Sequence, residues 1–450
     1  MGFGIMETVL LTDFGSTYTK VVAVDIIQPR LLGYASAHTT AAADVNIGLN
    51  IALDELKRLT GVSEYHKRFA CSSAAGGLRM IACGLVPELT AKAASLASMG
   101  AGAKIVGLYS YELTEDDAEE ITSKSPDILL LTGGTDGGNK KCILYNAQVL
   151  AETPGDFPII VAGNRNCNSE IKKILKHRQT YFCENVMPAI GVLNIEPTRQ
   201  LIRNIFLERI VHAKGFGNEV LMPTPAAVLT ATEMLAKETG ELMAIDVGGA
   251  TTDVYSITDG TPRASSTLFK GLPEPYAKRT VEGDIGMRYS ASGILEAVGP
   301  TRIIELTGVC EDSVHDYIEY ITKHPESIPQ TEEQKALDFA LASAAIDTAT
   351  TRHAGTIEEV YTSSGRVLAQ TGKDLTNVNK ILMTGGALLN SDRQQELVKH
   401  ALSDTGNLNS LRPKKADLLI DKHYILAAMG LLSGYDPKAA LKITQENISG

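Results

Sequence analysis

The chain lacks any apolar run of the roughly 18 residues that a helix needs to cross a bilayer, because charged residues interrupt its apolar stretches. It also lacks the basic-then-apolar layout of a secretory signal, since Glu7 and Asp13 interrupt the apolar residues near the N-terminus. We therefore expect no membrane association and a cytoplasmic location.

Cysteine usage is sparse and shows no metal-binding or disulfide pattern. Six cysteines are scattered along 450 residues without a Cys-x-x-Cys pair, which favours reduced thiols in a cytosol over a disulfide framework or a structural zinc site. The nine histidines form no His-x-x-x-His pair, so a tightly bound transition metal is not expected. Cys167 has no histidine close in sequence, and we expect an inert thiol.

Positive charge is in deficit. The 42 lysines and arginines are outnumbered by 53 acidic residues, which gives a formal net charge of −11. A protein whose main partner is a nucleic-acid backbone usually carries the opposite balance, so we expect no nucleic-acid partner. With 44% hydrophobic residues, the chain is long enough to bury the cores of two or three domains.

Two stretches share a strand-turn-strand pattern that indicates an internal duplication. In residues 7–26, an apolar run leads into the turn Asp13-Phe14-Gly15-Ser16-Thr17, and a second run follows from Lys20. In residues 242–258, the corresponding turn is Asp246-Val247-Gly248-Gly249-Ala250-Thr251-Thr252-Asp253. Each pattern predicts a β-hairpin.

Between the two hairpins, short apolar strands alternate with amphipathic helices. We expect strands at 104–109, 127–131, 158–162 and 180–183, and helices near 114–124, 138–151 and 168–178. This alternation predicts a parallel sheet covered on both faces and inserted as a unit of its own. After the second hairpin we expect helices near 288–307, 311–323, 332–353 and 422–433, and one strand at 380–383.

The composition of the two turns suits the binding of phosphate and magnesium. Glycines let the backbone approach closely, so that amide N–H groups point at phosphate oxygens, and small hydroxyls add donors. An aspartate at the head of each turn is a hard oxygen ligand for hydrated Mg²⁺. Two such hairpins, facing each other across a cleft, would hold the phosphates of a nucleotide from both sides.

Four motifs resemble those of the actin, sugar-kinase and heat-shock-chaperone ATPases. Asp13 to Lys20 resembles the first phosphate motif, Pro223 to Leu229 the connecting helix, Asp246 to Asp253 the second phosphate motif, and Met383 to Ala387 the adenosine motif. They occur in the family's order and span nearly the whole chain. The resemblance implies an α/β fold of duplicated actin-like, ribonuclease-H-like ATPase domains with the inserted parallel-sheet unit in the first half.

The same resemblance implies a site for ATP or ADP with Mg²⁺. Catalytic roles fall to Asp13, Lys20, Asp246 and Asp253, and the magnesium is held by Asp13 and Asp246, through water. The residues expected to contact the nucleotide are Gly15, Ser16, Thr17, Gly248, Gly249, Thr251, Thr252, Gly385 and Gly386.

One position departs from the family's pattern. The chaperones carry a glutamate beside the proline of the connecting motif, associated with positioning the attacking water, whereas this chain has Thr224. Losing one water-orienting carboxylate leaves binding intact and slows turnover, because phosphoryl transfer depends on positioning and charge neutralisation. We therefore expect an ATPase of modest turnover.

Three further strings resemble the MutL/GlmL family, which is unrelated to the mismatch-repair protein of similar name. They are Thr132 to Asn139, Ala244 to Asp253 and Glu282 to Arg288. Members are accessory proteins of adenosylcobalamin-dependent mutases such as glutamate mutase. The resemblance implies a chaperone-like reactivating factor whose protein partner is such a mutase. A small-molecule kinase and an actin-like filament or scaffold protein remain alternatives, and a homo-oligomer is possible.

The expected domains follow from these assignments. They are 1–100 for the first part of the first ATPase half, 101–200 for the inserted unit, 201–238 for the continuation with the connecting helix, 239–425 for the second half with the adenosine motif, and 426–450 for the C-terminal helix and tail.

Two more polar regions are candidate ligand sites, and the first of them combines three stretches of the chain. Gly133 to Asn139 follows a buried strand and opens a helix, and Asn164 to Asn166, Glu184 and Asn185 follow the next two strands. In a parallel sheet these residues share the carboxyl edge, where open α/β sheets bind ligands; ordinary solvated turns are the alternative. Glu282 to Asp284 is a candidate acidic contact to the nucleotide, or a solvated loop.

Overall fold

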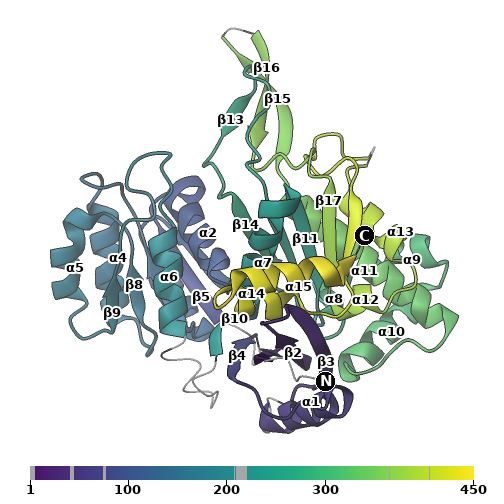
Figure 1. Cartoon of the computed structure of the whole chain (residues 1–450). Coiled ribbons are helices and arrows are strands. Elements are labelled where there is room, and N and C mark those ends of the chain that lie inside the picture. Colours follow the sequence, from purple (N-terminus) through teal and green to yellow (C-terminus); the bar gives the residue numbers. More distant parts are fainter. Residues whose placement is uncertain are drawn as a thin grey trace. The chain divides into compact units, whose positions relative to one another are not determined.

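A computed structural model describes residues 6–40, 45–73, 78–206, 208, 220–363, 365–404 and 406–449 (Figure 1). The chain divides into two compact units. Unit 1 comprises Met1–Ala75, Ala227–Phe269 and Tyr276–Gly450, and unit 2 comprises Gly76–Ala226 and Lys270–Pro275. Within the described residues, no helix is long and apolar enough to cross a membrane.

The first hairpin of unit 1 forms as predicted and lies in a mixed sheet. Its strands are β1 (Thr8–Phe14), β2 (Tyr18–Asp25), β3 (Arg30–His38) and β4 (Lys67–Ser72), in the spatial order β4-β1-β2-β3. β1 pairs antiparallel with β2 and parallel with β4, and β2 pairs antiparallel with β3. Helix α1 (Val45–Thr60) packs on β2 and β3 through a core that includes Leu10, Val21 and Leu56.

The second hairpin forms the centre of another sheet with the same plan. The strands are β11 (Leu242–Val247), β12 (Thr252–Ile257), β14 (Ala277–Glu282), β17 (Lys380–Thr384), β18 (Asp417–Asp421) and β19 (Ile448–Ser449), in the order β14-β12-β11-β17-β18-β19. β11 pairs antiparallel with β12 and parallel with β17, as β1 does with β2 and β4. The predicted duplication, and with it the actin-like α/β fold class, is confirmed.

Helices fill the rest of unit 1. They are α7 (Thr224–Thr239), which begins in unit 2, and then α8 (Ala291–Val298), α9 (Pro300–Thr307), α10 (Glu311–Lys323), α11 (Glu332–His353), α12 (Gly386–Leu389), α13 (Gln394–Leu397), the 3₁₀ turn Val398–Ala401, α14 (Leu426–Ser433) and α15 (Pro437–Asn447). The helical stretch expected near 288–307 is present, but it is divided. Gly299 has φ +75° and Pro300 starts a new helix, so the stretch forms two helices.

A three-stranded sheet in unit 1 escaped the sequence analysis. It consists of β13 (Leu268–Lys270), β16 (Gly365–Thr371) and β15 (Thr356–Thr362), in that order. Its strands are mostly exposed or half-buried, so they lack the apolar runs by which the other strands were recognised.

Unit 2 contains the predicted parallel sheet. Its strands are β5 (Leu78–Gly84), β6 (Ala103–Ser110), β7 (Ile128–Leu131), β8 (Ile159–Val161) and β9 (Thr180–Phe182), in the order β6-β5-β7-β8-β9, and all four pairings are parallel. Its other elements are the π-helical turn Pro87–Ala91, α2 (Lys92–Gly100), α3 (Glu115–Lys124), α4 (Lys141–Glu152), the 3₁₀ turn Arg165–Cys167, α5 (Asn168–Ile174), α6 (Glu196–Ile205) and β10 (Val220–Pro223).

The extent of unit 2 differs from the expected insertion at 101–200. Strand β5 precedes that stretch, yet it pairs with both β6 and β7 inside the sheet. The compact unit therefore begins at Gly76 and continues to Ala226. The assignment of the remaining segments to two ATPase halves stays a prediction.

Candidate nucleotide site

The first hairpin places an ion pair at its turn. Asp13 and Lys20 are direct cross-strand partners of β1 and β2, and Lys20 Nζ lies 3.1 Å from Asp13 Oδ2. The turn is tight, because Gly15 N–H donates to the carbonyl of Tyr18 and a Cβ at Gly15 would lie 2.6 Å from that oxygen. The close approach explains why the turn requires glycine.

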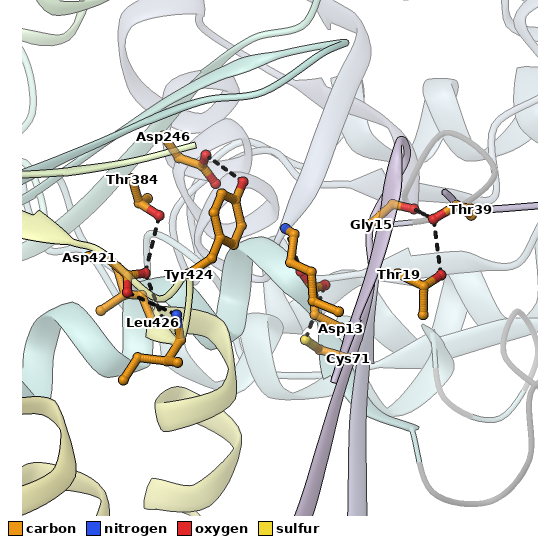
Figure 2. A network of polar contacts seen from close by, with 12 residues as sticks. Asp13, Gly15, Thr19, Thr39, Cys71, Asp246, Thr384, Asp421, Tyr424 and Leu426 are labelled. Carbon is orange, nitrogen blue, oxygen red and sulfur yellow. Dashed lines mark hydrogen bonds and ion pairs between the residues drawn. The ribbon is translucent and has the colours of Figure 1, made fainter. Parts of the chain in front are cut away.

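Thr39, the residue after β3, supports the first turn. Its hydroxyl donates to the carbonyl oxygen of Gly15 over 2.9 Å, and its N–H donates to the carbonyl oxygen of Thr17 over 2.8 Å (Figure 2). Two carbonyl groups of the turn are thereby held in place. No sequence motif distinguishes Thr39 from other threonines, so the analysis of motifs missed it.

The second hairpin places two acidic residues at the positions that Asp13 and Lys20 occupy in the first. Asp246 and Asp253 are direct cross-strand partners of β11 and β12. Asp253 is buried and accepts hydrogen bonds from Arg279 of β14 at 2.6 and 2.7 Å, and from Thr251 at 3.0 Å. Arg279 therefore neutralises one member of the acidic pair.

The two turns lie directly against each other. A Cβ at Gly249 would lie 2.7 Å from Thr17 Oγ1, so any side chain there would require the Thr17 hydroxyl to move. The Thr17 hydroxyl oxygen is buried there and makes no hydrogen bond within the described structure. A buried hydroxyl without a partner raises the free energy of the folded chain, and a phosphate oxygen between the turns would provide one.

Tyr424, in the turn after β18, contacts both hairpins. The Lys20 ammonium lies 3.4 Å from the centroid of the Tyr424 ring, and the Tyr424 hydroxyl donates to Asp246 Oδ1 over 3.4 Å (Figure 2). The sequence analysis missed this residue because it lies in none of the recognised motifs. Its positive φ of +55° is visible only in the structure.

The adenosine motif lies beside the same turn. Gly385 follows β17 with φ +105°, and a Cβ there would lie 2.9 Å from Asp246 Oδ1. Thr384, just before it, donates to the buried carboxylate of Asp421 over 3.2 Å. Asp421 also accepts the N–H groups of Ile425 and Leu426, both at 2.9 Å, at the start of α14. The end of β17, the β18 turn and the second hairpin thus form one connected network.

The electrostatics of the site follow from this crowding. Burial above all raises the pKa of Asp246, the nearby carboxylates of Asp253, Asp13 and Asp421 add to this rise, Lys20 opposes it, and the resulting pKa is about 7. Burial lowers the pKa of Lys20, but Tyr424, Asp13 and Asp246 outweigh burial and raise it overall. Lys20 is therefore a permanent cation, whereas Asp246 takes up a proton more readily than an ordinary carboxyl group.

The side chains of some predicted contact residues are engaged elsewhere. The hydroxyl of Thr252 is buried and donates to the carbonyl oxygen of Ile285, and that of Thr251 donates to Asp253. Ser16 is exposed, and the space around a Cβ at Gly386 is open. Direct contacts from these residues to a nucleotide stay predictions, and this geometry gives Thr251, Thr252 and Asp253 a role in holding the second turn.

The segment after β14 supports the second turn through its backbone. The N–H of Met287 donates to the carbonyl of Gly248, and the N–H groups of Arg288 and Tyr289 donate to that of Gly249. Glu282, considered above as an acidic contact to the nucleotide, instead pairs with Arg352. The stretch therefore supports the turn, and an acidic contact from the segment Glu282 to Asp284 to the nucleotide stays a prediction.

Comparison with known proteins identifies the family. The family model described as MutL protein matches residues 9–448. The chain belongs to this family. Protein MutL of Clostridium tetanomorphum is 46% identical over 459 residues, which cover 98% of this chain and 99% of that protein. The family membership inferred from the sequence is thus confirmed.

Three solved structures are more distantly similar to the chain. Nucleotide-free acetone carboxylase is 13% identical, with 95% of this chain and 70% of that chain covered and a TM-score of 0.42. Gluconate kinase from Lactobacillus acidophilus is 11% identical (98% and 92% covered, TM-score 0.35), and component A of the (R)-2-hydroxyglutaryl-CoA dehydratase of Acidaminococcus fermentans is 10% identical (96% and 99% covered, TM-score 0.33). At these TM-scores the likenesses are too weak to support an inference about this chain.

The residues at the site fit a magnesium nucleotide. Hard carboxylate oxygens of Asp13 and Asp246, the Lys20 cation and the unpartnered Thr17 hydroxyl suit Mg²⁺ and phosphate. No group of three or more histidine, cysteine or acidic residues within the described ranges is arranged to bind a metal ion directly. A magnesium ion here would accordingly keep several of its waters.

The polar residues at the carboxyl edge of the unit 2 sheet come together as expected. Asp136 forms an ion pair with Arg165 at 3.5 Å and accepts a hydrogen bond from Asn185 at 3.0 Å. The side-chain amide of Asn164 forms hydrogen bonds with the backbone from Gly137 to Asn139. Asn164 and Asn185 are buried, and their amides hold the loop in place. A ligand site at this edge stays a prediction, since these hydrogen bonds explain the residues as supports of the loop.

Proposed function

We propose that the chain binds ATP with Mg²⁺ between the two hairpins and acts as an accessory factor of an adenosylcobalamin-dependent mutase. One observation carries the nucleotide proposal. Two hairpins of identical topology meet turn to turn, with Asp13, Lys20 and Asp246 gathered beside the contact. A protein does not need this arrangement for stability, because it crowds three charged groups into one buried place.

Each residue of the proposed site has a distinct role. The backbone N–H groups of both turns and the Lys20 ammonium would contact phosphate oxygens. Asp13 and Asp246 would hold the waters of magnesium, whose charge offsets that of the phosphates. Gly385 lets the end of β17 pack against the second hairpin, since a Cβ there would lie 2.4 Å from the carbonyl oxygen of Val247, and the backbone that follows would contact adenosine.

Hydrolysis is expected to be slow. The water-orienting glutamate of the chaperones is replaced by Thr224 at the start of α7. Asp253, the other carboxylate considered for this task, is bound to Arg279 and Thr251. The chain would therefore hold ATP for long periods between turnovers, as suits a factor that grips and releases a partner.

The partner proposed is a cobalamin-dependent mutase such as glutamate mutase, and the membership of the MutL family supports it. Nucleotide between the hairpins would favour the arrangement in which both sets of phosphate contacts are made. A partner that prefers one arrangement would be bound and released as the nucleotide changes. The six free cysteines suit a reducing cytoplasm, where we place this activity.

The decisive experiment mixes the purified chain with a mutase inactivated by damaged cobalamin, fresh adenosylcobalamin and ATP. We expect mutase activity to return when the wild-type chain and ATP are present. It should not return when the Lys20→Met variant replaces the wild-type chain. The Glu88→Gln variant, altered at an exposed residue of unit 2, is the matched control and should behave as wild type. If ATP binds but activity does not return, the reactivation role is wrong while the nucleotide site stands.

A further inference from the structure

Tyr424 joins the charged groups of the two hairpins through a single side chain. Its ring lies 3.4 Å from Lys20 Nζ, on the first hairpin, and its hydroxyl reaches Asp246, on the second. Figure 2 shows the Tyr424 hydroxyl pointing to the Asp246 carboxylate. Neither contact is needed to form β18 or α14, the two elements that Tyr424 connects.

The backbone at Tyr424 has a conformation that disfavours a large side chain. Its φ of +55° lies in the left-handed region, which only two other non-glycine residues of the described structure adopt, Tyr111 and Ser125. Asp421 imposes this conformation, because its carbonyl accepts the N–H of Tyr424 and its carboxylate accepts those of Ile425 and Leu426. Glycine or asparagine would suit the position better, so the tyrosine side chain itself has a use.

We propose that Tyr424 is a positioning residue of the nucleotide site, with its ring orienting the Lys20 ammonium and its hydroxyl orienting the Asp246 carboxylate. This role rests on the proposed binding of nucleotide between the hairpins. Lys20 is a long side chain with many rotamers, and a ring face against its ammonium restricts them. Asp13 restrains the same ammonium from the other side at 3.1 Å.

Two variants and a control separate the two contacts. Calorimetry on the full chain measures ATP affinity at saturating magnesium, and a second series at varied magnesium measures the magnesium requirement. Tyr424→Phe keeps the ring, so ATP affinity stays within about twofold while the magnesium concentration needed for half-maximal binding rises. Tyr424→Leu removes both contacts and weakens ATP binding about tenfold. Tyr34→Phe, on a tyrosine that stacks on His423 instead, is the control and binds as wild type.

Tyr424→Asn distinguishes positioning from a structural role. Asparagine tolerates the left-handed conformation, so this variant is expected to melt no lower than Tyr424→Leu while binding ATP equally weakly. A purely structural tyrosine would give the opposite result, in which binding follows the melting temperature across the series.

A double-mutant cycle tests whether Tyr424 acts through Lys20. In the Lys20→Met background, the further change Tyr424→Leu should weaken ATP binding by less than twofold. Independent, additive losses overturn the role, and so does an affinity of Tyr424→Leu equal to or above that of wild type, which would make the ring an obstacle to binding. A wild-type chain that binds no ATP overturns the proposed function itself, and this role with it.

Discussion

The two hairpins of unit 1 share topology and register but carry opposite charge at one equivalent position. The leading aspartate of the first turn, Asp13, faces Lys20 across its strand pair, whereas the leading aspartate of the second, Asp246, faces Asp253. In the first hairpin the two side chains neutralise each other through an ion pair. The second pair consists of two carboxyl groups, and Arg279 supplies the cation that binds Asp253.

This difference gives each hairpin a separate task. Lys20 is a fixed cation that would contact phosphate in the proposed site, and Asp246 is left as the carboxylate whose pKa is raised to about 7 by burial and its acidic neighbours. A magnesium ion with phosphate would satisfy both. The two hairpins therefore have the same backbone plan. They differ in charge at one equivalent position, which is Lys20 in the first hairpin and Asp253 in the second.

The largest effect is expected from removing the cation that stabilises the second hairpin. Arg279→Met leaves the buried Asp253 carboxylate without its main partner, which should lower the free energy of unfolding by about 3–5 kcal/mol. Chemical denaturation measures the loss. The double variant Asp253→Leu, Arg279→Met should recover much of it, and a single variant as stable as wild type would contradict the account.

Removing the cation of the first hairpin should affect binding more than folding. Lys20→Met deletes a charge-assisted contact to phosphate and should weaken ATP binding by about ten- to a hundredfold. Equilibrium binding of a fluorescent ATP analogue measures it. Lys20→Arg should retain part of the affinity, and equal binding by Lys20→Met and wild type would show that phosphate lies elsewhere.

The contact between the turns can be tested by adding one methyl group. Gly249→Ala places a Cβ 2.7 Å from Thr17 Oγ1 and should destabilise the chain by about 1–3 kcal/mol. Gly386→Ala is the matched control, because the space around its Cβ is open. Thermal unfolding of both variants compares them, and equal melting temperatures would argue against the close approach of the turns.

The raised pKa of Asp246 predicts the smallest effect, which concerns pH. An acid whose folded pKa exceeds its unfolded value stabilises the folded chain at low pH and loses that contribution as pH rises through the folded pKa. Without magnesium, wild type should therefore lose about 1.4 kcal/mol of stability relative to Asp246→Asn between pH 6 and 8. Plots of the free energy of unfolding against pH that run parallel for the two proteins would refute the raised pKa of Asp246. Added magnesium nucleotide should suppress the difference between the two plots.

Local patterns in the sequence were sufficient to predict the elements that have a distinctive apolar run or turn sequence. The hairpins at Asp13 and Asp246 and the strands β6 to β9 of unit 2 were recognised from apolar runs and turn residues, whereas the buried strand β5 was missed. The half-buried strands β15 and β16 have no such run and were missed. The split between α8 and α9 was overlooked because the apolar pattern continues across Gly299 and Pro300.

The sequence by itself determined the duplication, the family and the identity of the charged groups at each turn, because these depend on residues close together in the chain. Only the tertiary structure decided how those groups are paired. Arg279 is 26 positions from Asp253, and Tyr424 is 178 positions from Asp246. Strand pairing and the strained turn at Tyr424 bring them within reach, and no local pattern encodes such distant contacts.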